Sequence, residues 1–342
     1  MREVDSPSRT RRVHGWSRWP ISMPRRNVRQ PDDHQPAVPQ DSHHLSVMSS
    51  SGRRAREPAW LDRKAYPFER NYIDVGPGRM HFVDEGSGPT VLFVHGNPTW
   101  SFMYRRCILR MSASRRCIAP DLVGFGLSDR PAGWSYSPED QAACLRRLLD
   151  ELDLDEIAIV VHDWGGPIGL DAAFRSGCAI RCCVILNTIM WPIASWSRLG
   201  IFARTFGSSV GSVATRRANV LARLMPFGIG DRKAFPSTVH RQYIEPLRDD
   251  AAASAALPGA FLQSAPFLDG LWARRSNLKA IPTHIMWGMK DPVFRTSHLD
   301  RWRSALSDAH VTTLGEVGHF VAEEAPYHVT HALEQSERCS SR

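Results

Sequence analysis

Ile157-Ala-Ile-Val-Val-His-Asp-Trp-Gly-Gly166 is the stretch that decides the fold. Its first five residues are apolar without alternation, as in a strand buried on both faces of a parallel sheet. The two glycines at its end indicate a tight turn into a helix, so Asp163 is predicted to lie at a sharp corner between strand and helix. Because sites on open α/β sheets lie beyond the carboxyl ends of strands, this corner is a candidate functional site.

The segments on either side of this stretch alternate between strand-like and helix-like patterns from residue 70 onward. The alternation predicts an α/β fold with a mostly parallel central sheet and helices on both of its faces. An antiparallel lead-in is expected at 72–75 and 80–84, and further core strands at 90–95, 117–119, 182–186 and 284–288. The clearest helix begins after Ser137, an N-cap that precedes Pro138.

The alternation stops after Leu186 and resumes at Ile281. Residues 189–277 are rich in Trp, Arg and Ala and contain no strand-like run. They are therefore expected to form a helical cap inserted into a core that comprises residues 58–188 and 278–336. Residues 337–342 are expected to form a C-terminal tail.

The composition is that of a soluble globular protein, with 42% hydrophobic and 23% charged residues among 342. No run of 18 apolar residues is present, so no membrane span and no membrane partner are expected. The net charge of +8 suggests at first a partner such as nucleic acid or an anionic membrane. Residues 1–57 carry 11 Arg against 6 Asp and Glu, or +5, which leaves +3 for the remaining 285 residues. A nearly neutral body predicts neither a nucleic-acid partner nor a membrane partner.

Residues 1–57 are expected to be a disordered basic extension, because they lack a periodic apolar pattern. They also lack the apolar core of a secretory signal, and their acidic residues count against a mitochondrial presequence. Met48 is an alternative start, and the sequence leaves open whether residues 1–47 belong to the protein. The seven cysteines form no CxxC pair or zinc-like spacing, which favours free thiols in a reducing compartment and a cytoplasmic location.

The corner at Asp163 matches the nucleophile elbow of α/β-hydrolases, in which the serine of G-x-S-x-G is held above the sheet. Here Asp occupies the nucleophile position, and Val161 stands where the first glycine would be. A carboxylate at an elbow can attack an sp³ carbon and form an alkyl ester, expelling a halide or an epoxide oxygen. The alternative at this point is that Asp163 only caps the helix.

Two downstream residues complete a triad in the order nucleophile, acid, His that this fold uses. Asp291 comes just after the strand at 284–288, and His319 lies in the loop after the next strand, beside Gly318. Both are therefore expected at the carboxyl edge of the sheet with Asp163. Asp291 is the candidate acid and His319 the candidate base.

Asn97 and Trp164 are candidates for binding a leaving anion. Asn97 follows the strand at 90–95 and Trp164 follows the nucleophile, the two positions whose backbone N–H groups form the oxyanion hole. Their side-chain N–H groups are neutral donors that would stabilise developing negative charge without pairing with the nucleophilic carboxylate. Core packing for Trp164 and a turn role for Asn97 are the alternatives.

Five stretches together resemble the haloalkane dehalogenase family, from about Tyr66 to Leu333. They are His95-Gly-Asn-Pro-Thr-Trp-Ser-Phe-Met-Tyr-Arg105, Asp121-Leu-Val-Gly-Phe-Gly-Leu-Ser-Asp-Arg-Pro131, His162-Asp-Trp-Gly-Gly166, Trp287-Gly-Met-Lys-Asp291 and Gly318-His-Phe320. The resemblance implies hydrolysis of haloalkanes to an alcohol and halide, through an ester on Asp163 that water activated by His319 cleaves. It also implies Asn97 and Trp164 as the halide pair, and neither metal nor organic cofactor.

One branch of the family carries a catalytic Glu after the strand that precedes the cap. Asn187-Thr188 stands there in this sequence, so the resemblance assigns the acid to Asp291, in a branch with an Asp-His-Asp triad. Asp121, Asp129 and Arg130 are interpreted as residues that fix a loop. Whether Trp191, Trp196 or Trp272 of the cap adds a second halide contact is left open, as are the oligomeric state, the preferred halogen and the chain length.

Three other functions are considered. Epoxide hydrolysis uses the same Asp and His but needs cap tyrosines, and the cap contains only Tyr243. A luciferase-like oxygenase would use the same triad. A binder of nucleic acid or an anionic surface would use the Arg-rich extension, and its affinity would fall steeply with salt.

Overall fold

A computed structural model describes residues 57–340 of the chain. The prediction of disorder for the N-terminal extension, except for residue 57, therefore lies outside the described residues. All seven cysteines lie within them and are free, and six of the seven are buried. No helix in this range is long and apolar enough to cross a bilayer.

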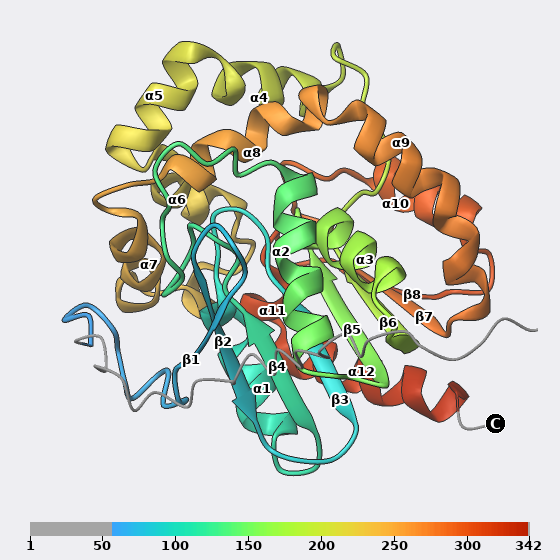
Figure 1. Cartoon of the computed structure of the whole chain (residues 1–342). Helices are drawn as coiled ribbons and strands as arrows, with labels where there is room; N and C mark the ends of the chain where they lie inside the picture. Colours follow the sequence, from blue (N-terminus) through green and yellow to red (C-terminus); the bar gives the residue numbers. More distant parts are fainter. Residues whose placement is uncertain (1–56, 341–342) are drawn as a thin grey trace, which may run out of the picture. The chain divides into compact units, whose positions relative to one another are not determined.

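Eight strands form one sheet in the order β1-β2-β4-β3-β5-β6-β7-β8 (Figure 1). The strands are β1 (Asn71–Asp74), β2 (Arg79–Glu85), β3 (Thr90–Val94), β4 (Arg116–Pro120), β5 (Glu156–His162), β6 (Ala179–Leu186), β7 (Thr283–Gly288) and β8 (His310–Leu314). β2 pairs antiparallel with β1 and β4, and every other pair is parallel. This confirms the antiparallel lead-in and the mostly parallel sheet.

Helices cover both faces of the sheet (Figure 1). The core helices are α1 (Arg105–Met111), α2 (Pro138–Glu151), α3 (Gly165–Arg175), α10 (Thr296–Ala305), α11 (Val321–Glu324) and α12 (Pro326–Ser340). The helix predicted after Ser137 is confirmed as α2, and the Ser137 side chain accepts a hydrogen bond from the Asp140 N–H. α12 differs from the prediction of a tail, because it remains helical through residues 337–340.

The chain between β6 and β7 is a helical insertion, defined here as residues 189–277. Its helices are α4 (Arg198–Gly207), α5 (Ser209–Ala218), α6 (Val220–Leu224), α7 (Ser237–Ile244), α8 (Ala252–Gln263) and α9 (Ala265–Ala273). None of these residues belongs to a strand of the described sheet. α4 and α5 both pack on α8 and lie along the upper edge of Figure 1.

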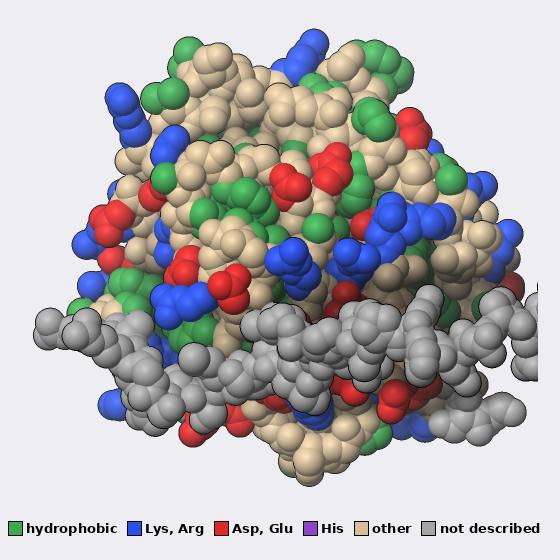
Figure 2. All heavy atoms as spheres, in the orientation of Figure 1, with side chains coloured by type: hydrophobic (Ala, Val, Ile, Leu, Met, Phe, Trp, Pro, Cys, Tyr) green, Lys and Arg blue, Asp and Glu red, His purple; other side chains and the backbone are tan. Residues whose placement is uncertain are grey.

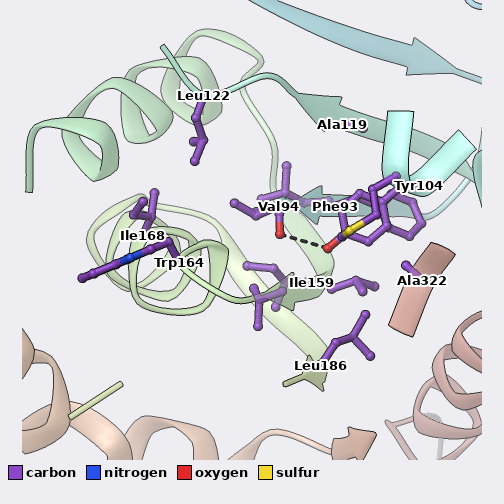
Figure 3. Packing of buried hydrophobic residues seen from close by; sticks show 14 of the residues in the cluster. Phe93, Val94, Tyr104, Ala119, Leu122, Ile159, Trp164, Ile168, Leu186 and Ala322 are labelled. Carbon is purple, nitrogen blue, oxygen red and sulfur yellow. Dashed lines mark hydrogen bonds between the residues drawn. The ribbon is translucent and has the colours of Figure 1, made fainter. Parts of the chain in front are cut away.

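The central strands are buried from both sides, as the run without alternation in 157–161 predicts. Figure 3 shows Val94, Ile159 and Leu186, from three adjacent strands, between Ile168 of α3 and Tyr104. The Tyr104 hydroxyl donates a hydrogen bond of 3.0 Å to the Val94 carbonyl oxygen. Full burial of such an aliphatic side chain contributes about 1.5–3 kcal/mol, so these strands give a rigid base for the residues at their ends.

Candidate active site

Asp163 lies on the corner between β5 and α3, with a left-handed φ of +50°. Asp is one of the few residue types other than glycine that adopt this region readily. The corner is tightly packed, because a Cβ atom on Gly96 would come within 2.4 Å of the Asp163 carboxylate. A Cβ atom on Gly166 would come within 2.1 Å of Thr188 Oγ1. The small residues around the corner therefore allow the close approach of three chain segments.

Asp163 is 6% exposed, and its carboxylate is held by backbone donors. The Asn97 N–H donates to Oδ1 over 2.8 Å, and the Trp164 N–H also donates to the carboxylate. Burial raises the pKa of Asp163, while the positive charge of a protonated His319 and the two N–H groups act in the opposite direction. The two predicted oxyanion-hole N–H groups thus converge on the predicted nucleophile.

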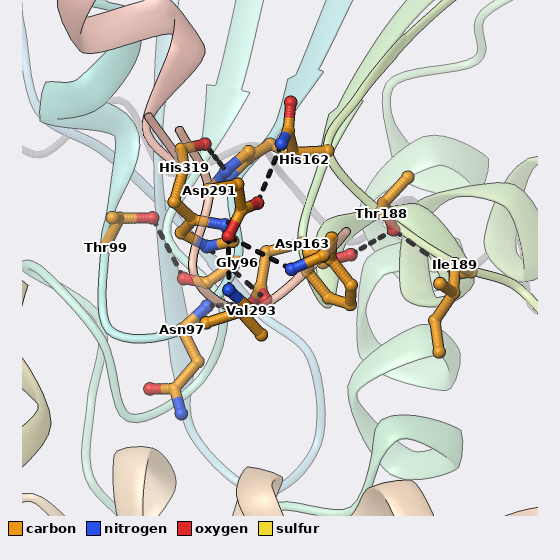
Figure 4. A network of polar contacts seen from close by, with 12 residues as sticks. Gly96, Asn97, Thr99, His162, Asp163, Thr188, Ile189, Asp291, Val293 and His319 are labelled. Atoms are coloured by element: carbon orange, nitrogen blue, oxygen red, sulfur yellow. Dashed lines mark hydrogen bonds and ion pairs between the residues drawn. The ribbon is translucent and has the colours of Figure 1, made fainter. Parts of the chain in front are cut away.

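His319 stands between the two carboxylates (Figure 4). Its Nδ1 lies 2.8 Å from Asp291 Oδ2, and its Nε2 lies 3.7 Å from Asp163 Oδ2. Burial lowers the pKa of His319, but the charge and hydrogen bond of Asp291 and the charge of Asp163 outweigh burial, so that the pKa is raised above 6.5. The structure therefore brings the three predicted triad residues together in the predicted arrangement, from the ends of three strands.

Asp291 is held by a set of donors that leaves its carboxylate oriented toward His319. Oδ1 accepts hydrogen bonds from the Val293 and Phe294 N–H groups at 2.6 and 3.0 Å. Asn187 Nδ2 donates to Oδ2 over 2.7 Å, while Asn187 Oδ1 accepts from the Gly288 N–H over 2.8 Å. Asn187, which follows β6, thus supports the candidate acid Asp291, which follows β7.

His162, the last residue of β5, was not singled out from the sequence as a site residue. Its Nε2 donates to the His319 carbonyl oxygen over 2.8 Å, and its ring centroid lies 4.6 Å from that of His319. The signal that could have identified it is its place as the one polar residue that ends an apolar strand. His162 holds the backbone of the loop that carries His319.

The Trp164 indole has the environment expected of an anion donor. Its Nε1 is buried and has no hydrogen-bond partner among the described residues, and its ring stacks on Phe261 of α8 at 4.2 Å. A buried indole N–H without a partner is costly, and an anion bound at that place would satisfy it. Trp164 lines the cavity described below.

The Asn97 side chain is turned toward the insertion rather than toward Asp163 (Figure 4). Its Nδ2 donates to the Ser254 carbonyl oxygen of α8 over 3.0 Å, and its Oδ1 is buried without a partner. An amide has two N–H groups, so one remains for a second acceptor. Asn97 therefore meets the Asp163 carboxylate through its backbone and links the core to α8 through its side chain.

A cavity of about 420 Å³ lies over Asp163, Trp164 and His319. The insertion supplies most of its wall, which is mainly apolar and includes Phe202 of α4 and Phe261 of α8. No tyrosine lines this cavity. The single tyrosine of the insertion, Tyr243, is buried elsewhere, and its hydroxyl donates to Glu323 Oε2.

Neither Trp191, Trp196 nor Trp272 lines the cavity. Trp191 and Trp272 pack edge-on against each other at 5.0 Å between ring centroids, and Trp196 is 79% exposed. None of the three therefore adds an indole N–H to the cavity wall that Trp164 lines.

The interpretation of Asp121, Asp129 and Arg130 as loop-fixing residues agrees with their contacts. Asp121 is fully buried and accepts hydrogen bonds from the Ser101 and Leu127 N–H groups. Asp129 forms an ion pair with Arg79 at 3.0 Å, and Arg130 donates to the Gly126 carbonyl oxygen. No group of three or more His, Cys, Asp or Glu among residues 57–340 is arranged to hold a metal ion.

Comparisons with known proteins agree with this fold. The alpha/beta hydrolase fold model matches residues 89–326. "Haloalkane dehalogenase 2" of Mycobacterium tuberculosis is 37% identical over 276 residues, which cover 80% of this chain and 96% of the relative. The crystal structure of the haloalkane dehalogenase DbeA from Bradyrhizobium elkani superposes with a TM-score of 0.71 at 26% identity, covering 80% of this chain and 99% of that one.

The chain therefore belongs to the alpha/beta hydrolase fold family, and within it to the haloalkane dehalogenase family. This confirms both the predicted fold class and the resemblance drawn from the five motifs. A relative with another name is also similar, the cis-3-alkyl-4-alkyloxetan-2-one decarboxylase of Shewanella oneidensis. It is 31% identical over 300 residues, covering 81% of this chain and 92% of the relative.

Proposed function

We propose that this protein is a haloalkane dehalogenase, a hydrolase that converts a haloalkane and water into an alcohol and a halide ion. The observation that carries the proposal is the unpartnered indole N–H of Trp164, buried in an apolar cavity beside the carboxylate of Asp163. A serine at this corner would suit acyl transfer, whereas a carboxylate with a neutral donor for a leaving anion suits displacement at carbon.

In the first step, an oxygen of Asp163 attacks the carbon that bears the halogen. The carbon–halogen bond breaks as the new carbon–oxygen bond forms, and the halide takes the bonding electrons. The Trp164 indole N–H and the free N–H of the Asn97 amide are the donors for the departing halide. The Trp164 indole N–H is preorganised, whereas the Asn97 amide, which donates to Ser254 of α8, has to direct its remaining N–H into the cavity. Both donors are neutral, so they stabilise charge as it develops without neutralising the attacking carboxylate.

In the second step, water attacks the carbonyl carbon of the ester while His319 Nε2 takes a proton from it. The separation of 3.7 Å between Nε2 and Asp163 Oδ2 suits a base that acts on the ester through water. The backbone N–H groups of Asn97 and Trp164 already face the Asp163 carboxylate, and they hold the oxyanion that forms there. When this intermediate collapses, the bond between the carbonyl carbon and the alkyl oxygen breaks, and that oxygen takes the proton from His319 and leaves as the alcohol. Asp291 stabilises the imidazolium until this transfer, and Asp163 is regenerated.

The experiment that tests this proposal is halide release from a panel of brominated and chlorinated alkanes. His319→Gln should leave alkylation intact and trap the ester, which intact-protein mass spectrometry would detect as a mass increase equal to the alkyl group. The matched control is His328→Gln, a surface position outside the cavity. Sustained turnover by His319→Gln contradicts the proposed roles, and so does the absence of an ester on this variant when the unchanged enzyme releases halide from the same substrate.

A second candidate function is decarboxylation of a cis-3,4-dialkyloxetan-2-one, and this compound is therefore added to the panel of substrates. The Shewanella relative supports it, and the mainly apolar cavity wall suits alkyl substituents. Release of carbon dioxide and alkene from the oxetanone, with no halide released from any haloalkane, would favour this candidate over dehalogenation.

Epoxide hydrolysis is less well supported, because no tyrosine lines the cavity to protonate an epoxide oxygen. An imidazopyrazinone substrate tests the luciferase-like oxygenase on the same triad. We also propose that the helical insertion acts as a cap over the triad, because it supplies most of the cavity wall. We further propose that the protein works in the cytoplasm, since all seven of its thiols are free.

A further inference from the structure

The insertion carries a surface that combines arginines with exposed apolar side chains. Residues 191–230 contain five Arg and neither Asp nor Glu. Trp196 is 79% exposed and Val210 is 81% exposed, so large apolar groups protrude among these charges. Nothing in the proposed reaction uses these side chains, and of the five arginines only Arg198 lines the cavity.

Exposed apolar and basic residues form a stripe along each helix. On α4, Arg198, Ile201 and Arg204 recur every three residues, and on α5, Val210, Val213 and Arg217 recur every three or four. Both helices pack on α8, so both stripes point away from it. We call this surface the basic apolar face; it consists of Trp196, Arg198, Ile201, Arg204, Val210, Val213 and Arg217. Figure 2 shows separate hydrophobic and basic side chains along the upper edge of the molecule, where α4 and α5 lie.

The positive charge of this face is largely unneutralised by the described residues. Arg204 and Arg217 make no ion pair with any of them, whereas the neighbouring Arg216 pairs with Asp250 at 3.3 Å. Arginine side chains beside exposed tryptophan and aliphatic groups match a partner whose charge is negative and whose interior is apolar. From this complementarity we propose that the basic apolar face docks on the surface of a bilayer that contains anionic lipids.

The mouth of the cavity lies beside the same face. Phe227 and Leu224 line the cavity and are 71% and 39% exposed, and Arg198 lines the cavity while belonging to the face. On the proposed function, the substrate is an apolar molecule that partitions into membranes. Docking would place the mouth where that substrate is most concentrated.

Two other occupants fit the face less well. A second copy bound through the same face by two-fold symmetry would set these arginines against one another. A nucleic-acid backbone would satisfy the arginines but would leave Val210, Val213 and Trp196 without an apolar partner. Docking on the surface of a bilayer leaves the expectation of no membrane span unaffected, but it departs from the sequence-based expectation that the protein has no membrane partner.

The test is co-sedimentation of the full-length protein with vesicles, in the absence of substrate. Vesicles of equal parts phosphatidylcholine and phosphatidylglycerol should bind it, and vesicles of phosphatidylcholine alone should bind it much less. Arg204→Gln/Arg217→Gln should weaken binding to the anionic vesicles roughly 30-fold, or about fivefold for each arginine removed near such a surface. The matched control is Arg146→Gln/Arg147→Gln on α2, which removes two exposed arginines from another surface and should bind like the unchanged protein.

A second variant separates bilayer docking from charge attraction alone. Val210→Ser/Val213→Ser keeps every arginine and should weaken vesicle binding roughly tenfold while leaving affinity for duplex DNA unchanged. Equal binding by the face variants and the control overturns the proposal, and assigns any vesicle binding to another part of the chain. A second copy would instead be the occupant if light scattering detects a dimer of the unchanged protein and finds monomers for both face variants. Failure of halide release would refute the proposed reaction but leaves vesicle binding as a separate result.

Discussion

The strand ends and the helical insertion contribute to the site in different ways. Asp163, Asp291 and His319 are each held at short distances by backbone or buried polar groups of the core. The insertion contributes mainly apolar wall such as Phe202, whose position depends on helix packing. The difference indicates that the core determines which reaction occurs, and that the insertion determines which substrates reach it.

Breaking the Asp291–His319 contact tests most directly whether the core determines the reaction. Asp291→Asn should lower the rate of ester hydrolysis about 10⁴-fold, because the neutral amide neither selects the productive His tautomer nor stabilises the imidazolium. The measurement is single-turnover decay of the alkylated enzyme by mass spectrometry. Alkylation itself should change far less, since Asp163 is retained.

The pH dependence of the same variant supplies a second readout. His319 is the base only when neutral, so in the unchanged enzyme hydrolysis should decline as pH falls through the raised pKa of His319, above 6.5. Asp291→Asn removes the main group that raises this pKa, so the acid limb should move to lower pH. An acid limb that stays in place would show that Asp291 does not act on His319.

The attachment of the insertion to the core depends on a buried ionic cluster around Glu323. Its carboxylate is fully buried and bonds to Arg105 through two hydrogen bonds of 2.7 Å, and to Arg106 and the Tyr243 hydroxyl. Glu323→Gln leaves buried guanidinium charge without a counterion and should lower the free energy of unfolding by about 3–5 kcal/mol. Chemical denaturation measures this loss.

The control for Glu323 is an exposed carboxylate in an ion pair. Glu316 pairs with Lys290 and its side chain is 85% exposed, so Glu316→Gln should change stability by less than about 1 kcal/mol. Similar effects from the two substitutions would show that the buried cluster adds nothing special to the joint between insertion and core.

Trp164 lies at the boundary between the two regions, because its backbone serves the core site and its ring stacks on α8. Trp164→Phe keeps an aromatic ring against Phe261 but removes the indole N–H. The alkylation rate should fall about 10²–10³-fold, the usual loss when one preorganised donor is removed. Trp191→Phe, which changes an indole outside the cavity, should react like the unchanged enzyme. Equal rates for both variants would remove Trp164 from the halide site.

The core site could be predicted from the sequence because strand periodicity locates strand ends, and parallel strands bring those ends to one edge. Asp163, Asp291 and His319 follow from this rule without knowledge of side-chain packing. The Asn97 amide could not be placed, because its contact with Ser254 joins segments 157 residues apart. The sequence shows only that Asn187 is not a Glu. Its hydrogen bond to Asp291 could not be predicted, because that contact depends on the register of β6 against β7.

The insertion was predictable in kind but not in arrangement. Its lack of strand-like runs indicates helices, yet α8 is apolar on nearly every side and contains Pro258, so its sequence does not reveal which neighbours it packs against. The Tyr243 hydroxyl, which does not line the cavity, donates to Glu323, 80 residues further along the chain. Contacts of this kind depend on how separate helices pack, and no local pattern encodes them.

The two sides of α4 can be compared by their effect on substrate selectivity, which is the smallest of the expected effects. Phe202 lines the cavity and Ile201, its neighbour in sequence, is 49% exposed on the basic apolar face. Phe202→Ala should enlarge the cavity and raise the ratio of kcat/KM for longer over shorter bromoalkanes roughly tenfold, since a few methylene groups in an apolar pocket discriminate by about 1–3 kcal/mol. Ile201→Ala should leave this ratio unchanged with dissolved substrates. A ratio that moves equally in both variants would mean that α4 affects selectivity through its overall position, and not through the wall it presents to the substrate.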